Sequence, residues 1–223
     1  MRALPCSVLI GFFLIGTVIG NTDAELCVGN LRCEYKVDPL GIDRARPRLS
    51  WIMLCKQRNQ EQTAYQILVA SSPERLAAQQ GDLWDSAKQT ADQSMHVVYA
   101  GKALQSNQTC YWKLRVWDRQ GRASAWSEPA RWTMALCAAS DWQAQWIRRP
   151  ASGPSDEAEG LPLFRRAFAC RSGVKRALVH VCGLGHYELF LNGQKVGDRF
   201  LNPAWSVYEK TVYYNSYDVT HHL

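Results

Sequence analysis

The sequence lacks the features that mark a membrane protein, a disordered chain or a zinc-bound scaffold. Its one extended apolar run, Val8–Ile19, has 12 residues, whereas a transmembrane helix needs about 20. Charged residues make up 21% of the 223 positions and hydrophobic residues 47%, which excludes disordered, collagen-like and coiled-coil chains. None of the eight cysteines forms a C-x-x-C pair, so neither zinc nor thioredoxin-type chemistry is indicated.

The first residues are typical of a secretory signal peptide. Met1 and Arg2 precede the apolar run, and small residues follow at Gly20 and Ala24. An uncleaved membrane anchor is the alternative, and the short run argues against it. We therefore expect residues 1–24 to be a signal peptide and the chain to be exported to the periplasm or the extracellular space. Cleavage would leave seven cysteines, which we interpret as mostly buried thiols with at most one or two disulfides.

Positive charge is in excess but is spread along the chain. Lys and Arg outnumber Asp and Glu by 26 to 20, which gives a net charge of +6. Arg44, Arg46 and Arg48 form the only dense group, beside Pro47 at the entry to an expected strand. Nucleic-acid binding needs a basic face or stripe, so the sequence does not favour it.

Residues 31 to 135 carry the signals of a β-sandwich. Short segments with period-two patterning alternate with Gly, Pro, Asn and Asp clusters, and we expect strands at 48–54, 64–70, 96–99, 111–117 and 128–134. A short helix interrupts them, with Ser71 or Ser72 as its cap, Pro73 in its first turn, Glu74 in a capping box and Gly81 at its end. The set predicts a seven-stranded sandwich of the fibronectin type III or immunoglobulin kind.

The last predicted hairpin, which turns at Asp118–Gly121, has an unusual outer face. Strand alternation sends one set of side chains into the core: Trp112, Leu114 and Val116. The opposite face and the next strand would then combine cations with indoles: Lys113, Arg115, Trp117, Trp126 and Trp132. Such an arrangement predicts a cation–π ladder, worth roughly 0.5–1 kcal/mol per exposed pair. A sugar-stacking platform is the alternative interpretation.

The remainder of the chain predicts a second β unit. Residues 138–160 read as a linker that ends in a polar, acidic loop. After it, strand-like segments follow at 163–169, 175–182, 187–191, 196–198 and 211–214, and Asn192-Gly193 is a strong hairpin signal. The expected organisation is a signal peptide (1–24), a sandwich (28–137), the linker, and an incomplete second β-sandwich (161–223).

Several short motifs do not support a catalytic or metal site. Gly183-Leu-Gly185 is not followed by a third glycine or a helix, so it is not a dinucleotide loop. His180, Cys182 and His186 are metal-ligand types, but His180 and Cys182 are better explained as residues lining a sandwich. Asn107-Gln-Thr109 is a glycosylation sequon, which has meaning only in a eukaryotic secretory pathway. There is no G-x-S-x-G motif.

Long ordered motifs resemble the start of bacterial α-L-rhamnosidases of glycoside hydrolase family 78. In the first unit these are Asn30–Tyr35, Asp38–Asp43, Pro47–Trp51, Gln62–Ala70, Gly81–Ser86, Tyr111–Asp118 and Ser124–Pro129. In the second unit they are Leu191–Asp198, Pro203–Trp205 and Tyr217–Thr220. The resemblance implies an all-β chain, with a fibronectin-III-like or immunoglobulin-like sandwich followed by an incomplete jelly-roll-like sandwich.

The resemblance also implies what this chain does not contain. The family cleaves terminal α-L-rhamnose with inversion, which needs a general acid and a general base flanking the glycosidic bond. Those carboxylates lie in a helical (α/α)₆ barrel further downstream, so no catalytic residue is carried over and the chain is expected to be inactive alone. No metal or cofactor is expected, since calcium would be bound only by a complete second domain.

Two residues of the second unit are candidates for sugar contact. Glu188 and Asn192 share a strand face with Phe190, so hydroxyl hydrogen bonds and ring stacking could act together on a rhamnose-containing glycan. The main prediction is a truncated, non-catalytic amino-terminal region of an exported α-L-rhamnosidase-like enzyme. The alternative is a stand-alone secreted carbohydrate-binding or adhesion module without enzymatic activity.

Overall fold

The computed structural model describes residues 26–150 and 161–223, and its regular structure is almost entirely β. The predicted all-β class is therefore confirmed. The expected signal peptide at 1–24 and the acidic end of the linker at 151–160 lie outside the described residues. No helix in the described parts of the chain is both long and apolar enough to cross a membrane.

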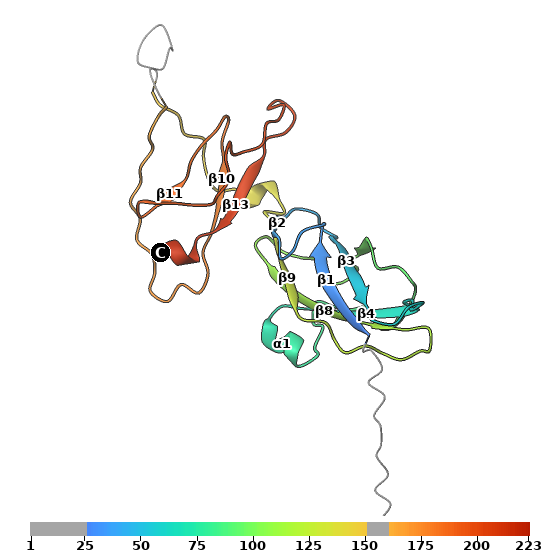
Figure 1. The fold of residues 1–223 in the computed structure, drawn as a ribbon. Coiled ribbons are helices and arrows are strands. Elements are labelled where there is room, and N and C mark those ends of the chain that lie inside the picture. Colours follow the sequence, from blue (N-terminus) through green and yellow to red (C-terminus); the bar gives the residue numbers. More distant parts are fainter. Residues whose placement is uncertain (1–25, 151–160) are drawn as a thin grey trace, which may run out of the picture.

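The first unit is a sandwich of two sheets (Figure 1). One sheet has the order β1-β3-β7, formed by β1 (Cys27–Cys33), β3 (Arg48–Leu54) and β7 (Val97–Val98). The other has the order β2-β9-β8-β4-β5, formed by β2 (Leu40–Ile42), β9 (Ala130–Met134), β8 (Thr109–Trp117), β4 (Ala64–Ala70) and β5 (Trp84–Asp85). A further short strand, β6 (Gln89–Thr90), also pairs with β4. The pairs are antiparallel except β2 with β9.

Period-two alternation builds the core between these sheets. Trp112, Leu114 and Val116 of β8 are fully buried, which confirms the predicted inner face. Trp132 was expected on the outer face, and this prediction is wrong. Its ring lies in the core, 5.9 Å from the ring of Tyr99 and 6.4 Å from that of Trp112, because β9 pairs with β8 in a register that directs it inward.

The one α-helix among the described residues, α1 (Pro73–Ala77), begins near where the sequence predicts but ends early. The Ser72 hydroxyl accepts a hydrogen bond of 3.3 Å from the amide of Arg75, so Ser72 is the N-cap. Arg75 rather than Glu74 therefore occupies the third helical position, where a capping box requires an acidic residue. The helix ends at Ala77 instead of continuing to Gly81, since Gln79 adopts a positive φ of 58°.

The second unit is built from two small strand pairs. β10 (Leu178–Cys182) pairs with β13 (Tyr214–Asp218), and β11 (Phe190–Leu191) pairs with β12 (Gln194–Lys195) through the predicted hairpin at Asn192-Gly193. Both turn residues have positive φ, 50° and 80°, as a two-residue hairpin of this sequence requires.

Other strand predictions for this unit need correction. Residues 163–169 are not a strand, although their pattern alternates, and residues 196–198 follow β12 rather than forming one. The strand expected at 211–214 begins only at Tyr214. A strand needs a partner for its backbone hydrogen bonds, and residues 163–169 have no partner strand in the described chain.

The interpretation of the cysteines as mostly buried is also wrong. Only Cys33 and Cys110 are buried, whereas the other described cysteines are half-buried or exposed: Cys27, Cys55, Cys137, Cys170 and Cys182. Burial raises the pKa of Cys110 to about 12 and also raises the pKa of Cys33. These two thiols therefore stay protonated and unreactive in the sandwich core.

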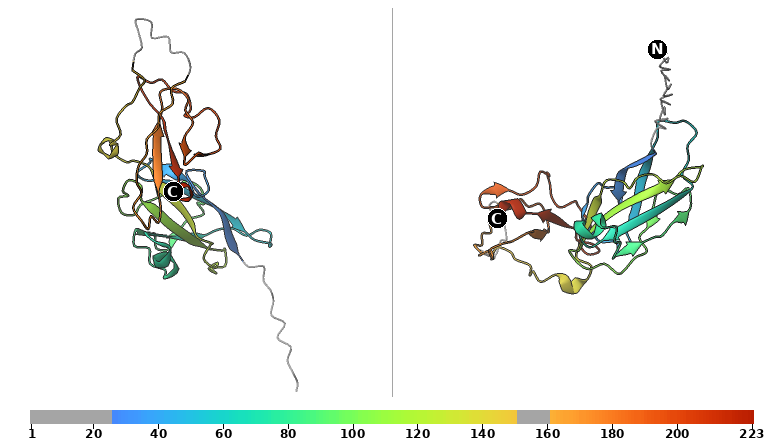
Figure 2. Two further views of the ribbon diagram at one scale, coloured as in Figure 1. Left: turned by 90° about the vertical axis from the view of Figure 1, so that its left-hand side faces the viewer. Right: turned by 90° about the horizontal axis from the view of Figure 1, so that it is seen from below.

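The two units differ in how well they bury apolar side chains. The sandwich has a continuous core, whereas the second unit leaves large apolar side chains exposed, among them Leu163 at 99%, Phe200 at 88% and Trp205 at 80%. The second unit lies at one end of the sandwich, where β13 approaches β2 (Figures 1 and 2).

Candidate functional site

Glu188 and Asn192, the two residues predicted to contact sugar, are both exposed, as is Phe190, but Asn192 lies in the hairpin turn after β11 and not on the strand. The Glu188 carboxylate forms an ion pair with Lys195, which itself lies over the Phe200 ring. The Asn192 side-chain amide donates a 2.7 Å hydrogen bond to the carbonyl of His222. The structure thus gives each residue its own contact and does not join the two in one pocket. Sugar binding by this pair stays a prediction.

The cation–π ladder forms on the outer face of the sandwich. The Arg115 guanidinium lies 5.0 Å from the centre of the Trp117 ring and 4.7 Å from that of Trp126. The Lys113 ammonium lies 5.3 Å from the centre of the Trp126 ring. The Lys88 ammonium, which the sequence analysis did not identify, lies 4.7 Å from the centre of the Trp117 ring. Cations therefore lie against both indoles, which favours the structural ladder over a sugar-stacking platform.

Two serines hold the segment that carries Trp126 against β8. The Ser127 hydroxyl accepts a 3.1 Å hydrogen bond from the amide of Leu114, and the Ser124 hydroxyl accepts one of 3.1 Å from the amide of Val116. The amides of Ser127 and Ser124 donate back to the carbonyls of the same two β8 residues, at 2.8 Å each. This segment therefore extends the sheet beside β8 without being a regular strand. Its hydrogen bonds hold the Trp126 ring next to the Arg115 guanidinium.

Arg176 connects the second unit to the sandwich. Its guanidinium forms an ion pair of 3.3 Å with Asp218 of its own unit. The same group donates to the hydroxyl of Thr133 at 2.9 Å and to the hydroxyl of Thr109. Across the same boundary, the amide of Leu136 donates a 3.0 Å hydrogen bond to the Tyr214 hydroxyl. Fixed polar contacts thus dock β10 and β13 on the end of the sandwich.

Of the residues considered as metal ligands, His180 lies at this same boundary, whereas the contact of Cys182 is within the second unit. One ring nitrogen of His180 is 2.7 Å from the Ser216 hydroxyl, and the other is 2.8 Å from the side-chain oxygen of Asn107, the sequon asparagine. Burial lowers the pKa of His180, so the neutral ring is favoured. Cys182 contacts the carbonyl of Tyr213 at 3.4 Å. Within residues 26–150 and 161–223, no group of three or more metal-ligating side chains converges.

The dense arginine group has a local structural role. Arg48 forms a two-pronged ion pair with Glu34, with contacts of 2.7 to 3.2 Å, and Arg44 approaches the same carboxylate at 3.9 Å. Burial alone would raise the pKa of Glu34, but the hydrogen bonds and charge of Arg48 outweigh it and lower this pKa. The group therefore neutralises an internal carboxylate and does not form a basic face.

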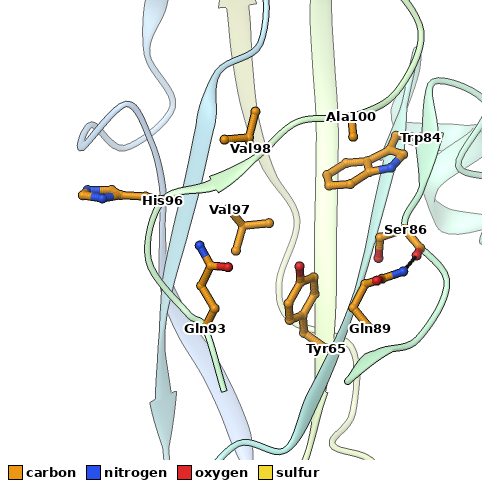
Figure 3. Close-up of a pocket in the computed structure, with 9 residues that line it drawn as sticks. All are labelled: Tyr65, Trp84, Ser86, Gln89, Gln93, His96, Val97, Val98 and Ala100. Carbon is orange, nitrogen blue, oxygen red and sulfur yellow. Dashed lines mark hydrogen bonds between the residues drawn. The ribbon is translucent and has the colours of Figure 1, made fainter. Parts of the chain in front are cut away.

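An open cavity of about 410 Å³, which sequence reasoning missed, lies on one side of the sandwich (Figure 3). It is bounded by the edge strand of one sheet, β7, and by β5 and β6 at the edge of the other. The lining residues are Tyr65, Trp84, Ser86, Gln89, Gln93, His96, Val97, Val98 and Ala100. They come from separate segments of the sequence, and only the sheet pairing brings them together.

One wall of this cavity depends on a close approach of two chain segments. A Cβ atom at Gly101 would lie 2.3 Å from the carbonyl oxygen of Leu83 and 2.5 Å from the Cβ of Trp84. Only glycine therefore allows the segment after β7 to pack beside β5. The Trp84 ring is held there edge-on to Tyr99, with 5.4 Å between ring centres.

Comparisons with known proteins match both units. Residues 28–138 match the family described as "Rha78A-like, N-terminal immunoglobulin domain", and residues 172–223 match "Alpha-L-rhamnosidase N-terminal domain". An α-L-rhamnosidase of Formosa agariphila is 38% identical over 207 residues, which is 84% of this chain and 22% of the relative. One from Streptomyces avermitilis is 46% identical over 128 residues, or 57% of this chain and 12% of the relative. The chain thus spans about a fifth or less of these curated relatives.

Solved structures agree with the sequence matches. The α-L-rhamnosidase of Dictyoglumus thermophilum superposes with a TM-score of 0.80 at 33% identity, covering 88% of this chain and 24% of that one. The Streptomyces avermitilis α-L-rhamnosidase, solved in complex with L-rhamnose, gives a TM-score of 0.56 at 31% identity, covering 89% of this chain and 21% of that one. The arrangement of a sandwich followed by a smaller β unit is therefore shared with these proteins.

Proposed function

Because this chain corresponds to the amino-terminal region of the α-L-rhamnosidases, we propose that it is the non-catalytic support of an exported enzyme that hydrolyses terminal α-L-rhamnosyl residues. The observation that carries the proposal is the pair of consecutive family matches, which together extend from residue 28 to residue 223. In this proposal, the sandwich is a structural domain, and the second unit connects it to the part of the enzyme that performs catalysis.

The exposed apolar side chains of the second unit support this role. Leu163, Phe200 and Trp205 lie open to solvent, and each sheet of the unit has two strands, whose outer edges are unpaired in the described chain. Monomeric proteins rarely leave such surfaces open. We propose that further chain of the same enzyme covers them and completes the unit.

The carboxylates of the described chain support the location of catalysis elsewhere. An inverting glycosidase needs two carboxyl groups that face each other across a sugar and a water molecule. Here, six described carboxylates form ion pairs with neighbouring cations: Glu34 with Arg48, Glu61 with Arg119, Asp82 with Arg75, Asp118 with Arg122, Glu188 with Lys195, and Asp218 with Arg176. These carboxylates stabilise the fold and are not poised as a general acid and base.

The coding sequence downstream of Leu223 tests the proposal. A reading frame that continues into further β strands and a helical barrel is the expected result. A protein that ends at Leu223 in the cell, and that folds and binds glycans as a secreted product, would overturn the proposal in favour of a stand-alone carbohydrate-binding module. Mass spectrometry of the secreted protein distinguishes the two, because it measures the length of the mature product.

A further inference from the structure

The cavity between β7 and the β5–β6 edge combines the features of a small-ligand site. Its volume of about 410 Å³ falls within the roughly 300–1,000 Å³ that such sites occupy. It lies where both sheets end, so the gap between their edge strands is open to solvent on one side. This site is separate from Glu188 and Asn192 and from the ladder, which share none of its lining residues.

The aromatic part of the lining offers a surface for stacking. The Trp84 ring is half-buried and lies along the upper wall, and Tyr65 rises from β4 toward the middle of the cavity (Figure 3). No cation lies over either ring in the described structure, in contrast to Trp117 and Trp126 of the ladder. A flat ligand with an apolar face could therefore reach Trp84 without displacing another group.

The polar part of the lining consists of two glutamine amides, one histidine and the hydroxyls of Tyr65 and Ser86, of which the Ser86 hydroxyl already donates to the carbonyl of Ala87 at 2.8 Å. Gln93 donates its amide to the carbonyl of Met95 at 2.9 Å, and Gln89, directly opposite Tyr65 in the β4–β6 pairing, donates its amide to the carbonyl of Ser86. Both side-chain carbonyl oxygens remain as acceptors. Burial raises the pKa of the Tyr65 hydroxyl, and no hydrogen bond to a described residue contributes to that shift.

The charge of the lining restricts the ligand further. None of the nine lining residues is Asp, Glu, Lys or Arg, and the one histidine, His96, is engaged by the Tyr35 hydroxyl at 2.5 Å. A charged ligand would therefore find no counter-ion, whereas a neutral ligand that is rich in hydroxyl donors fits the acceptors. Stacking on an indole together with hydroxyl hydrogen bonds is the chemistry that recognises a sugar ring.

We propose that this cavity is a binding site for a neutral pyranose unit of a glycan, with the sugar ring stacked on Trp84 and its hydroxyl groups bound by Gln89, Gln93 and Tyr65. The site is a property of the sandwich alone and does not depend on the enzymatic role proposed above. It would hold a glycan on the side of the sandwich between β7 and β5.

Titration of the isotopically labelled full chain with two probes, methyl α-L-rhamnopyranoside and methyl β-D-glucopyranoside, tests the site. We expect at least one probe to give saturable NMR shifts in the Trp84 indole and in the Gln89 and Gln93 side-chain amides. Methyl β-D-glucuronide, which carries a carboxylate, should bind more weakly than the matched neutral glucoside. No saturable shift at these groups with either neutral probe would overturn the proposal.

Variants separate this site from the rest of the sandwich. Trp84→Ala should weaken probe binding about tenfold, the scale of losing a central aromatic contact. Because Trp84 also packs on Tyr99, Gln93→Ala is the second variant. The Gln93 side chain is exposed, so this variant should fold normally while its probe binding weakens. Trp126→Ala, which removes a half-buried indole from the ladder, should leave probe affinity unchanged. Binding that survives both cavity variants, or that is lost in Trp126→Ala alone, would contradict the assignment.

Discussion

The Arg176 guanidinium of the second unit donates a 2.9 Å hydrogen bond to the Thr133 hydroxyl of the sandwich. Thr133 belongs to β9, whereas Arg176 precedes β10, so this contact ties the two units together. The Nε atom of the same guanidinium forms the ion pair with Asp218. A planar group with several donors can serve both partners at once, which a lysine could not do equally well.

Arg176→Ala should loosen the docking of the second unit without unfolding the sandwich. Hydrogen bonds from charged groups are worth more than neutral ones, and we expect amide exchange in β10 and β13 to rise about tenfold through local opening. Hydrogen-exchange mass spectrometry measures this. The control is Arg171→Ala, at an exposed arginine five positions earlier. Equal protection in both variants would show that Arg176 does not hold the interface.

The ladder predicts that Arg115 contributes more to stability than an arginine in a simple ion pair. Arg115→Met removes two cation–π contacts together with the hydrogen bonds to the Gln66 side-chain oxygen, and the loss of the cation–π contacts alone should lower the free energy of unfolding by about 1–2 kcal/mol. Arg119→Met removes only the exposed ion pair with Glu61, so its loss of stability should be clearly smaller. Urea denaturation followed by tryptophan fluorescence compares the two. A larger loss in the Arg119 variant would count against the ladder.

The position of Trp132 in the core gives a sharp contrast with Trp126. Trp132→Ala should cost about 3–5 kcal/mol because it leaves a large cavity, whereas Trp126→Ala should cost about 1–2 kcal/mol through its lost cation–π pairs. The buried Trp132 indole N–H has no acceptor among the described residues. Trp132→Phe should therefore be much milder than Trp132→Ala. Urea denaturation of the three variants ranks their losses of stability. Equal losses in Trp132→Ala and Trp126→Ala would contradict the position of Trp132 in the core.

The Asp118 turn predicts a specific loss of stability in acid. Asp118 is buried, and burial alone would raise its pKa, but hydrogen bonds from the amides of Arg122 and Gln120 and the ion pair with Arg122 outweigh burial and lower it. A lowered folded-state pKa means that the stabilisation is present above the unfolded value of 3.8 and is lost as the pH falls through the folded value.

The variant Asp118→Asn tests the direction of this pH dependence. The wild-type chain should be more stable than the variant at pH 7, and the difference should shrink below about pH 4. Chemical denaturation at pH 7, 5 and 3 gives the difference at each pH. A difference that stays constant or grows in acid would show that the Asp118 carboxylate is not stabilised in its charged form.

The sandwich could be predicted closely because its strands carry strong local patterns. The strands expected at 48–54 and 64–70 have those bounds in the structure, since β3 begins with clear alternation and β4 is a short, almost continuously buried apolar segment. The position of Trp132 could not be predicted from local pattern alone. Its residue type suited the outer ladder as well as the core, and only the pairing of β9 with β8 decided between them.

The second unit and the cavity could not be predicted in detail, because they are formed by contacts between residues far apart in the sequence. Residues 163–169 alternate as a strand does, but they have no partner strand in the described chain. The cavity joins Tyr65, Trp84, Gln89 and Gln93 across two sheet edges, and no short motif contains them. Glu188, Phe190 and Asn192 are each exposed, but Asn192 lies in the hairpin turn, and the partners of Glu188 and Asn192, Lys195 and His222, were not foreseen.

The central claim is that this region supports an α-L-rhamnosidase without performing its chemistry. The most direct measurement is the release of nitrophenol from p-nitrophenyl α-L-rhamnoside by the pure, folded chain, with a complete α-L-rhamnosidase as the positive control. We predict release no faster than in buffer alone. Turnover that follows the chain through purification and rises in proportion to its concentration would contradict the account, because it would place the catalytic carboxylates within these residues.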